Sequence, residues 1–478
     1  MGFEQKTAKK ISRREILKYG FNVGFGACLG GTLGLNACGK SSHRPIKNVI
    51  LIVLDTVRAD TLGCYGNKLG ITPIIDAVAS EGIRFEQAIS SSSWTIPALG
   101  SILTGTWPTI HGAFHMGNYM SPLRPEIPTA AEVFKENGFQ TFGLANCLNA
   151  SSVVHFHRGF DIFDDRTTMH ELSRRADETI DTSLKWIKKH QKKSNFVLIH
   201  IFDPHLYYDP LPGYITKFTQ GRDKPAPPLT KAQCLAMRTD HGKNPPLKDD
   251  VDYIKGLHYG EINFVDTCLA RLINELTKLD LYDQTALVIT SDHGEEFWDH
   301  NKFEHGHTTY DELIRVPLIL KLPRTFPVVN KVVKAQVRNI DIMPTLFNLT
   351  KIKKPASFTG QSLLPFIMGQ NESDLIAFSE RLHLGYSEKL CWRTGDYKYI
   401  LERDPSSKNR FQLYNLRNDL LEQRNIFNIE REITEKLHQD LVKFYSKIIS
   451  LANTMSKTRV KKLNHRQIEI LKSLGYIK

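Results

Sequence analysis

Acidic residues follow several apolar runs of strand length in this chain. Asp55, Asp203 and Asp292 each stand directly after such a run, and His293 comes next after Asp292. An isolated Asp after a strand usually caps a helix or forms a turn, but three recur here, and two of them have histidines close by. Carboxylates and an imidazole in one cluster are typical ligands of a divalent cation. The pattern therefore predicts a metal site.

The runs themselves predict an α/β fold with a mostly parallel central sheet flanked by helices. Residues 48–54, 196–202 and 285–291 are almost continuously apolar, as expected of strands buried on both faces. Apolar residues between 253 and 276 recur at the spacing of a helix. Because open α/β sheets bind ligands at the carboxyl ends of their strands, we expect the acidic residues to converge at one edge.

Thr95 lies in a second segment that suits anion chemistry. It precedes Ile96-Pro97 and opens an apolar stretch of helical character that ends at Gly105. This position places Thr95 near a helix N-terminus, where backbone N–H groups and the helix dipole favour anions. A threonine before proline also fits a plain helix cap, and the two roles are compatible.

The chain resembles the sulfatase family of the alkaline phosphatase superfamily over most of residues 46–430. Each matching block is weak alone, but the series stands in the family's order. The blocks include L-D-T-V-R-A-D-T-L-G-C-Y-G at 54–66, S-I-L-T-G-T-W-P-T-I-H-G at 101–112, F-D-P-H at 202–205, T-S-D-H-G-E-E-F at 290–297 and H-G-H-T-T-Y-D-E-L-I-R-V-P at 305–317. The resemblance implies an alkaline-phosphatase-like, mixed sheet and a smaller C-terminal α+β subdomain.

The resemblance also implies a divalent metal ion held by Asp55, Asp292 and His293, with the nucleophile at position 95 as the fourth ligand. Two carboxylates and an imidazole suit Zn²⁺ or Mn²⁺ better than Ca²⁺, although Ca²⁺ is frequent in the family and stays an alternative. A second ion is the less favoured arrangement. It would draw its ligands from Asp203, His205, His305 or His307.

The nucleophile position departs from the family pattern. Formylglycine sulfatases carry C-x-P-S-R or S-x-P-x-R here, whereas this chain has T-I-P-A-L, in which Leu99 replaces the arginine. Thr56 stands where many sulfatases have a second aspartate, and Asn146 stands near their lysine. Threonine cannot become the aldehyde that expels sulfate. A phosphorylated Thr95 would be released by in-line attack of water, so the residue favours phosphoester chemistry.

Histidines supply the expected proton donors. After Thr95 attacks phosphorus or sulfur, a histidine would protonate the leaving oxygen, and His205 and His307 are the candidates, with His305 behind them. The predicted substrate contacts are Thr56, His111, Asn146 and His305. His111 is equally compatible with closing a turn.

The N-terminus is typical of an export signal. The sequence S-R-R-E-I-L-K at 12–18 resembles a twin-arginine signature, and L-G-L-N-A-C-G-K at 33–40 resembles a lipobox that would place a lipid on Cys38. We therefore expect an exported lipoprotein, tethered to a membrane in the periplasm or at the cell surface. The alternative is a cytosolic chain with a fortuitous arginine pair.

The charge and the cysteine spacing limit the expected classes of site. The formal net charge is +12, and none of the seven cysteines forms a C-x-x-C pair, so neither a zinc knuckle nor a dense disulfide framework is indicated.

The order of the segments suggests the domain limits. The predicted parts are a signal at 1–37, a tether at 38–45, a catalytic domain at 46–370, a C-terminal subdomain at 371–452 and a basic tail at 453–478.

Together these features predict a metal-dependent hydrolase of sulfate or phosphate mono- or diesters that works through a covalent Thr95 intermediate. Two alternatives stay open: a phosphotransferase acting on envelope glycan or lipid, and an inactive protein that binds an anionic glycan. The expected partners are an anionic ester, from an envelope glycan or lipid, and a membrane. No basic helix interleaved with aromatic residues indicates nucleic acid.

Overall fold

An eight-stranded sheet forms the centre of the computed structural model, in the order β12-β2-β11-β8-β1-β7-β5-β6. Only β11 runs against its two neighbours, so the predicted mostly parallel α/β sheet is confirmed. The strands are β1 (Asn48–Leu54), β2 (Ile83–Ile89), β5 (Gln140–Leu144), β6 (Ile162–Asp164), β7 (Asn195–Ile201), β8 (Thr285–Ser291), β11 (Arg315–Lys321) and β12 (Val332–Arg338).

The structure describes residues 46–165, 174–219, 233–234, 236–237, 246–382, 387–404, 409–456, 458 and 460–473. The predicted export signal, the tether and Cys38 lie outside these residues. None of the helices in the described ranges combines the length and the apolar character that crossing a bilayer requires.

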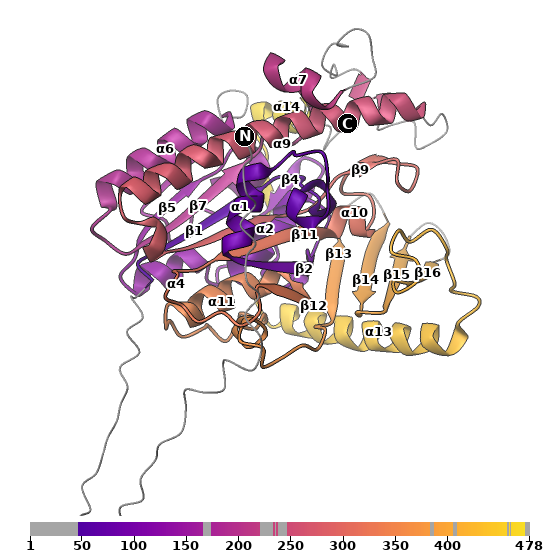
Figure 1. Cartoon of the computed structure of the whole chain (residues 1–478). Helices are drawn as coiled ribbons and strands as arrows, with labels where there is room; N and C mark the ends of the chain where they lie inside the picture. The colour runs from indigo at the N-terminus through magenta and orange to yellow at the C-terminus, as the bar shows by residue number, and fades with distance from the viewer. Residues whose placement is uncertain are drawn as a thin grey trace, which may run out of the picture. The chain divides into compact units, whose positions relative to one another are not determined.

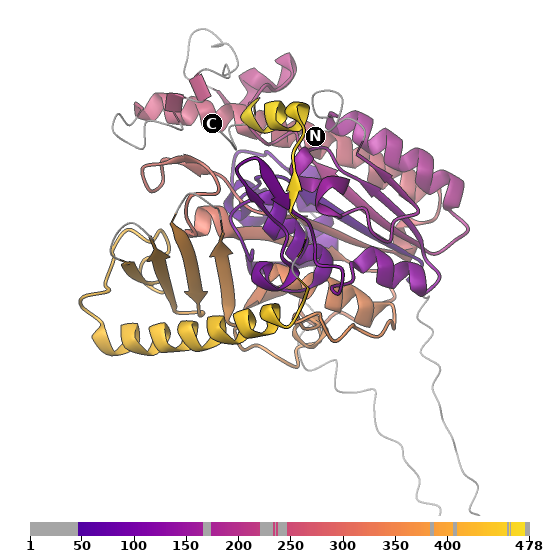
Figure 2. The same cartoon turned by 180° about the vertical axis from the view of Figure 1, so that it is seen from behind.

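Helices cover both faces of the sheet, as Figures 1 and 2 show from opposite sides. Successive side chains of a strand point to opposite faces, so β1 contributes Val49 and Leu51 to one hydrophobic layer and Ile50 and Ile52 to the other. The first layer contains α2 (Thr95–Thr104), α4 (Ala130–Glu136) and α11 (Ile342–Leu349); the second contains α1 (Pro73–Glu81), α6 (Ala176–His190) and α9 (Lys248–Lys278).

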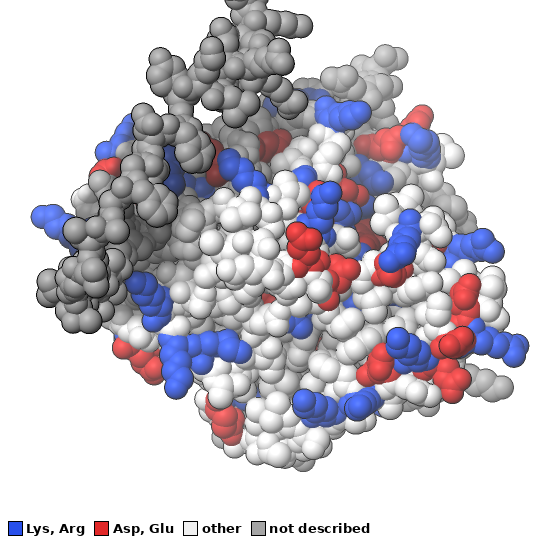
Figure 3. Space-filling model, turned by 60° about the horizontal axis from the view of Figure 1, so that its bottom comes forward, with Lys and Arg blue, Asp and Glu red and all other residues white. Residues whose placement is uncertain are grey.

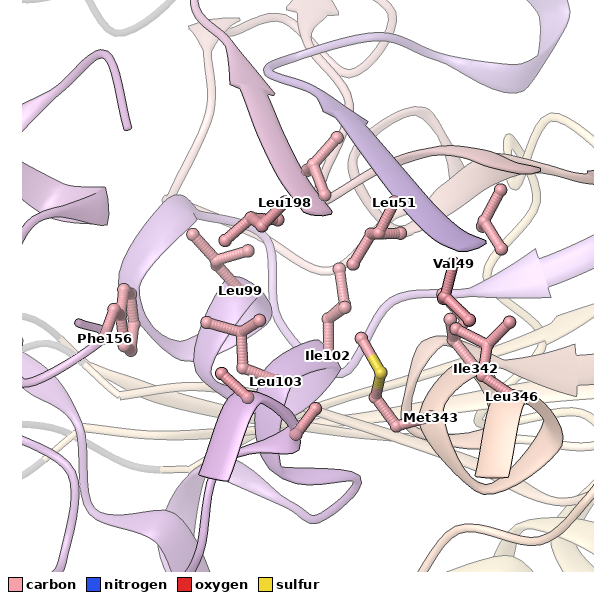
Figure 4. Packing of buried hydrophobic residues seen from close by; sticks show 14 of the residues in the cluster. Val49, Leu51, Leu99, Ile102, Leu103, Phe156, Leu198, Ile342, Met343 and Leu346 are labelled. Atoms are coloured by element: carbon pink, nitrogen blue, oxygen red, sulfur yellow. The ribbon is translucent and has the colours of Figure 1, made fainter. Parts of the chain in front are cut away.

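Helix α2 is buried along its whole length. Leu99, Ile102 and Leu103 lie beneath Leu51 of β1 and Leu198 of β7 (Figure 4). Leu99, which replaces the arginine of the family pattern, is therefore a core residue and contributes no charge to a site. Close packing of this kind fixes the position of the helix, and with it the position of Thr95 at its N-terminus.

A second, four-stranded antiparallel sheet follows, built from β13 (Ala377–Arg381), β14 (Glu388–Arg393), β15 (Tyr397–Arg403) and β16 (Arg410–Asn415). Helix α13 (Arg431–Asn453) packs along it (Figure 1), with Leu437, Leu441 and Tyr445 on the buried side. Trp107 makes edge-on ring contacts with Phe378 of β13 and Phe444 of α13, which joins this subdomain to the part of the chain that carries the eight-stranded sheet.

Shorter elements complete the described fold. They are α3 (Pro108–His111), β3 (Phe114–Met116), β4 (Tyr119–Ser121), α7 (Pro212–Phe218), β9 (Glu296–Phe297), β10 (Phe303–Glu304), α10 (Asp311–Ile314), α12 (Leu364–Ile367), β17 (Lys461–Lys462) and α14 (His465–Ser473). The predicted basic tail therefore contains regular structure: β17 pairs with β4, and Leu463 and Leu471 are buried in the core. On the face seen in Figure 3, Lys and Arg are interspersed with Asp and Glu rather than gathered into one basic patch.

A buried ion-pair network also links the two sheets. Asp311 of α10 accepts hydrogen bonds from Arg393 (2.8 Å) and from Lys398 (2.9 Å), and Lys398 also pairs with Glu422 at 2.8 Å. Burial alone would raise the pKa of Asp311, but the charges of Arg393 and Lys398 outweigh it and hold that pKa well below its usual value. The carboxylate is thus ionised in the folded chain and compensates two buried cations.

We predict that Asp311→Asn lowers the free energy of unfolding by about 3–5 kcal/mol, because it leaves Arg393 and Lys398 buried with less compensation. The pKa of Asp311 is depressed on folding, so its contribution is complete above the unfolded pKa of about 3.9 and is lost as pH falls through the folded value. Urea unfolding at neutral and acidic pH measures both effects. Asp396→Asn is the control, because Asp396 pairs with Arg417 at the exposed surface and its loss should cost under about 1 kcal/mol. Equal costs for the two variants would contradict this role of Asp311.

Candidate active site

Two neighbouring strand ends supply the predicted metal ligands. Asp55 follows β1 and Asp292-His293 follows β8, and these strands pair in parallel up to Leu54 and Ser291. His293 Nε2 lies 3.4 Å from Asp55 Oδ1 and 3.5 Å from Asp292 Oδ2. All three side chains are fully buried, and their ligand atoms form a group that could hold a metal ion.

Thr95 lies beside this cluster. It is the first residue of α2, and its Oγ1 lies 3.3 Å from His293 Nε2. The N-cap position belongs to Trp94, whose backbone is extended, so the Thr95 hydroxyl is not the cap of its helix. The helix N-terminus adds partial positive charge where an anion would bind.

The chemistry of the donor atoms fits a divalent cation. Both oxygens of Asp55 and Oδ2 of Asp292 have no hydrogen-bond partner among the described residues, although they are buried. Leaving buried carboxylates uncompensated is costly, and a dication removes that cost. His293 donates from Nδ1 to the Gly294 carbonyl oxygen (2.9 Å), which leaves the Nε2 lone pair facing the carboxylates.

The two carboxyl groups have pKa values shifted in opposite directions. Burial and the neighbouring Asp55 raise the pKa of Asp292 to about 6. Burial also acts against ionisation of Asp55, but its contact with His200 and the charges of His205 and His293 hold its pKa below the usual value. The strongest compensating charges come from histidines in both cases.

Two of the predicted histidines lie beside the cluster. The ring of His305 is 4.5 Å from the ring of His293, and that of His205 is 5.0 Å from His305, both between centroids. His305 Nδ1 lies 2.9 Å from Glu295 Oε1, and Tyr208 donates to the other Glu295 oxygen at 2.8 Å. His205 Nδ1 donates to the Leu206 carbonyl oxygen. Glu295 is thus positioned to orient His305 and stabilise its protonated form.

His307 forms a hydrogen bond with a side chain outside the cluster around His293. Its Nε2 lies 2.7 Å from Glu296 Oε2, in the segment that carries the short strands β9 and β10. The structure therefore brings His305, rather than His307, next to His293.

Three predicted substrate contacts make hydrogen bonds within the fold. Thr56 donates its hydroxyl to the Pro204 carbonyl oxygen (2.9 Å), and Asn146 donates to the His200 carbonyl oxygen (2.6 Å). His111 lies against α2: its Nε2 is 3.1 Å from the Pro97 carbonyl oxygen and its Nδ1 accepts from Ala113. His111 is fully buried, and these contacts secure the helix that carries Thr95.

The contacts of Asp203 differ from those expected of an aspartate at a strand end in the predicted cluster. Its Oδ1 accepts a hydrogen bond from the backbone N–H of Ala176 at 2.8 Å, at the start of α6. Asp203 therefore satisfies a backbone N–H in the first turn of a helix that precedes it in the chain, whose N-cap residue is Arg175. It is not a member of either group of metal-ligand atoms found among the described residues.

Sequence reasoning missed two residues beside Asp55. His200 of β7 has Nε2 3.3 Å from Asp55 Oδ2, and Cys147 follows β5 with its sulfur in the same group of potential ligand atoms. The available signal was a lone histidine inside the otherwise apolar run at 196–202. Cys147 had no such signal, because its nearness to Asp55 depends on β5 lying next to β7.

The sulfatase family pattern matches residues 47–352, which is more than half of the chain. The chain belongs to the sulfatase family. A second pattern, the C-terminal region of N-sulphoglucosamine sulphohydrolase, matches residues 298–447. With the fold and the buried donor cluster, this membership makes the chain a sulfatase-family hydrolase acting on sulfate or phosphate esters.

Relatives and solved structures agree with this assignment. The uncharacterized sulfatase YidJ of Escherichia coli strain K12 is 26% identical over 451 residues, covering 84% of this chain and 87% of that protein. A structure in complex with its substrate D-glucosamine-2-N,6-O-disulfate matches with a TM-score of 0.65 at 19% identity, over 87% of this chain and 99% of that one. The phosphonate monoester hydrolase of Agrobacterium radiobacter matches with a TM-score of 0.64 at 19% identity, and the match covers 86% of this chain and 96% of that one. The same fold thus occurs in proteins named for sulfur and for phosphorus chemistry.

We predict that this sulfatase-family chain loses divalent metal as pH falls. A proton competes with the cation for Asp292, whose pKa without metal is about 6, so the apparent affinity of the site formed by Asp55, Asp292 and His293 should fall by at least about tenfold per unit below that pH. Competition with a chelating dye across this range measures the effect. Asp60→Asn, which removes a carboxylate paired with Arg58, should leave the profile unchanged. An affinity that is independent of pH between about 5 and 7 would contradict the ligand assignment.

Proposed function

We propose that the chain cleaves phosphate mono- or diesters through a covalent intermediate on Thr95. The observation that carries this proposal is the position of the Thr95 hydroxyl, buried at the N-terminus of α2 and 3.3 Å from His293 Nε2. An unmodified hydroxyl next to three buried metal-ligand side chains is an arrangement that activates a nucleophile.

The threonine favours phosphorus for a chemical reason. In the first step Thr95 Oγ1 gives up its proton to solvent and forms a bond to phosphorus while the bond to the leaving oxygen breaks. In the second step water attacks the same phosphorus, and Thr95 Oγ1 takes up a proton and is released as its hydroxyl. A sulfated formylglycine hydrate releases sulfate when it collapses to the aldehyde, and a sulfated threonine cannot do this. It would need a second displacement at sulfur. Phosphoryl transfer proceeds readily by two in-line displacements.

The side chains around Thr95 divide the remaining tasks. Asp55, Asp292 and His293 would hold a divalent ion, which supplies Lewis acidity to the substrate oxygens and lowers the pKa of the Thr95 hydroxyl. His305, oriented by Glu295, would protonate the leaving oxygen. His205, beside His305, would contact the substrate.

The expected substrate is an anionic ester of a cell-envelope glycan or lipid. This part of the proposal rests on the lipobox-like sequence around Cys38, which would tether the exported chain to a membrane. A phosphotransferase shares the first displacement and differs only in using an alcohol as the acceptor of the second. Product analysis with added alcohol separates the two activities.

The nucleophile assignment predicts that Thr95→Ala lowers kcat/KM for para-nitrophenyl phosphate or bis-para-nitrophenyl phosphate by about 10⁴-fold or more. The same assays with para-nitrophenyl sulfate test the preference for phosphorus. Thr104→Ala is the matched control, because Thr104 lies at the other end of α2 and only bonds the Gly100 carbonyl oxygen. Unchanged turnover by Thr95→Ala would remove the proposed intermediate, and dominant turnover of the sulfate ester would overturn the argument from threonine chemistry.

The general-acid assignment makes a separate prediction. His305→Asn should lose about 10²–10⁴-fold in kcat for alkyl phosphate esters, whose leaving oxygen needs a proton, and much less for para-nitrophenyl esters. His307→Asn is the comparison, and its loss should not depend on the leaving group because His307 bonds Glu296. If only His307→Asn shows the leaving-group dependence, the roles of the two histidines are reversed.

A further inference from the structure

A second set of potential metal ligands lies on the other side of Asp55. Asp55, Cys147 and His200 each offer one ligand atom, and these atoms lie within 4.8 Å of one another. Asp55 and His200 are fully buried, and Cys147 is 4% exposed. Asp55 Oδ2 approaches His200 Nε2 (3.3 Å), whereas Asp55 Oδ1 approaches His293 Nε2 (3.4 Å). The two oxygens of one carboxylate thus face different groups of donors.

Position in the sheet explains why these residues meet. β7 lies between β1 and β5, and His200 pairs with Val53 of β1 in the parallel register. Side chains two residues apart share a face, so His200 lies on the same side as Leu198, the side covered by α2 (Figure 4). Cys147 comes shortly after β5 on that side of the sheet, in the same hydrophobic layer.

His200 has no hydrogen-bond partner for either ring nitrogen among the described residues. Its 3.3 Å approach to Asp55 is within ion-pair range but lacks hydrogen-bond alignment. Buried polar groups in native proteins are nearly always hydrogen-bonded, so an imidazole with no hydrogen bond to either nitrogen among the described residues is in a position to bind a ligand.

We propose that a second divalent cation binds between Asp55, Cys147 and His200, and that the Asp55 carboxylate bridges it to the first. Thiolate, imidazole and carboxylate together are typical ligands of Zn²⁺. Binding replaces the S–H bond of Cys147 with a sulfur–metal bond and releases the proton to solvent. Three protein ligands leave a fourth position for water or a substrate oxygen, as in catalytic rather than structural zinc sites.

The second ion deepens the proposed function and rests on its metal site, because Asp55 is common to both. Asn146 stands near the position where the family pattern has a lysine, so this chain lacks the positive charge of that side chain. An ion bound by the adjacent Cys147 would return positive charge to that side of the site. Two ions that share a carboxylate could bind two oxygens of one phosphoryl group.

Metal content and a cobalt spectrum test the proposal. The purified chain should hold two Zn²⁺ ions, and replacement by Co²⁺ should give a thiolate-to-cobalt charge-transfer band in the near ultraviolet. Cys147→Ser should abolish that band and leave one tightly bound ion, and His200→Gln should weaken the same ion. Cys391→Ser is the matched control, because Cys391 is a fully buried cysteine of β14 that belongs to neither ligand group.

Asp292→Asn separates the two sites. It should weaken binding of the first ion and retain the thiolate band. Cys147→Ser should instead retain the first ion and abolish the band. A wild-type chain that binds one Co²⁺ with no thiolate band would overturn the second site, whether or not the variants fold. Two ions together with full activity of Thr95→Ala would instead overturn the proposed function and leave the second site standing.

Discussion

The buried Asp55 carboxylate is the group on which the site depends. It ends β1, which lies between β7 and β8, so it faces ligands that come from both neighbours. Neither of its oxygens has a hydrogen-bond partner among the described residues, and its strongest compensating contacts are with histidines. A charge held in this way inside an apolar fold destabilises the chain unless a cation accompanies it. The sheet therefore favours metal binding before any substrate arrives.

The rest of the catalytic domain holds Thr95 against that charge. Helix α2 has no exposed residue, and its side chains pack against β1 and β7 of the sheet and against α11, which lies beside it in the same layer (Figure 4). His111 contacts the Pro97 carbonyl oxygen of α2. Gly100 leaves room for the His111 ring, since a Cβ on residue 100 would lie 2.7 Å from that ring. The distance between Thr95 and His293 is thus set by core packing rather than by a surface loop. A nucleophile positioned in this way needs little reorganisation to react.

Sequence patterns predicted the parts of the site that follow from strand continuity. Asp55, Asp292 and His293 come together because β1 and β8 are parallel neighbours in register, and an apolar run predicts such a strand. Asp203 lies one residue further from β7 than Asp55 lies from β1. Its side chain accepts a hydrogen bond from the first turn of α6, a helix that precedes β7 in the chain, and no strand pattern predicts this contact. His305 and His307 are two residues apart and bond the adjacent Glu295 and Glu296. Their spacing alone could not decide which one approaches His293.

Charge at the site connects the metal content to the substrate. Asp55, Asp292 and an ionised Thr95 would carry three negative charges, so a single dication would leave this centre anionic. Only the α2 N-terminus and a protonated His305 would then attract an anionic ester, since Leu99, which stands where the family pattern has an arginine, carries no charge. A second dication bound through Cys147 would neutralise the centre even after its thiol proton is lost. Where other members of the family have a lysine and an arginine, this chain would use a second metal ion to admit its substrate.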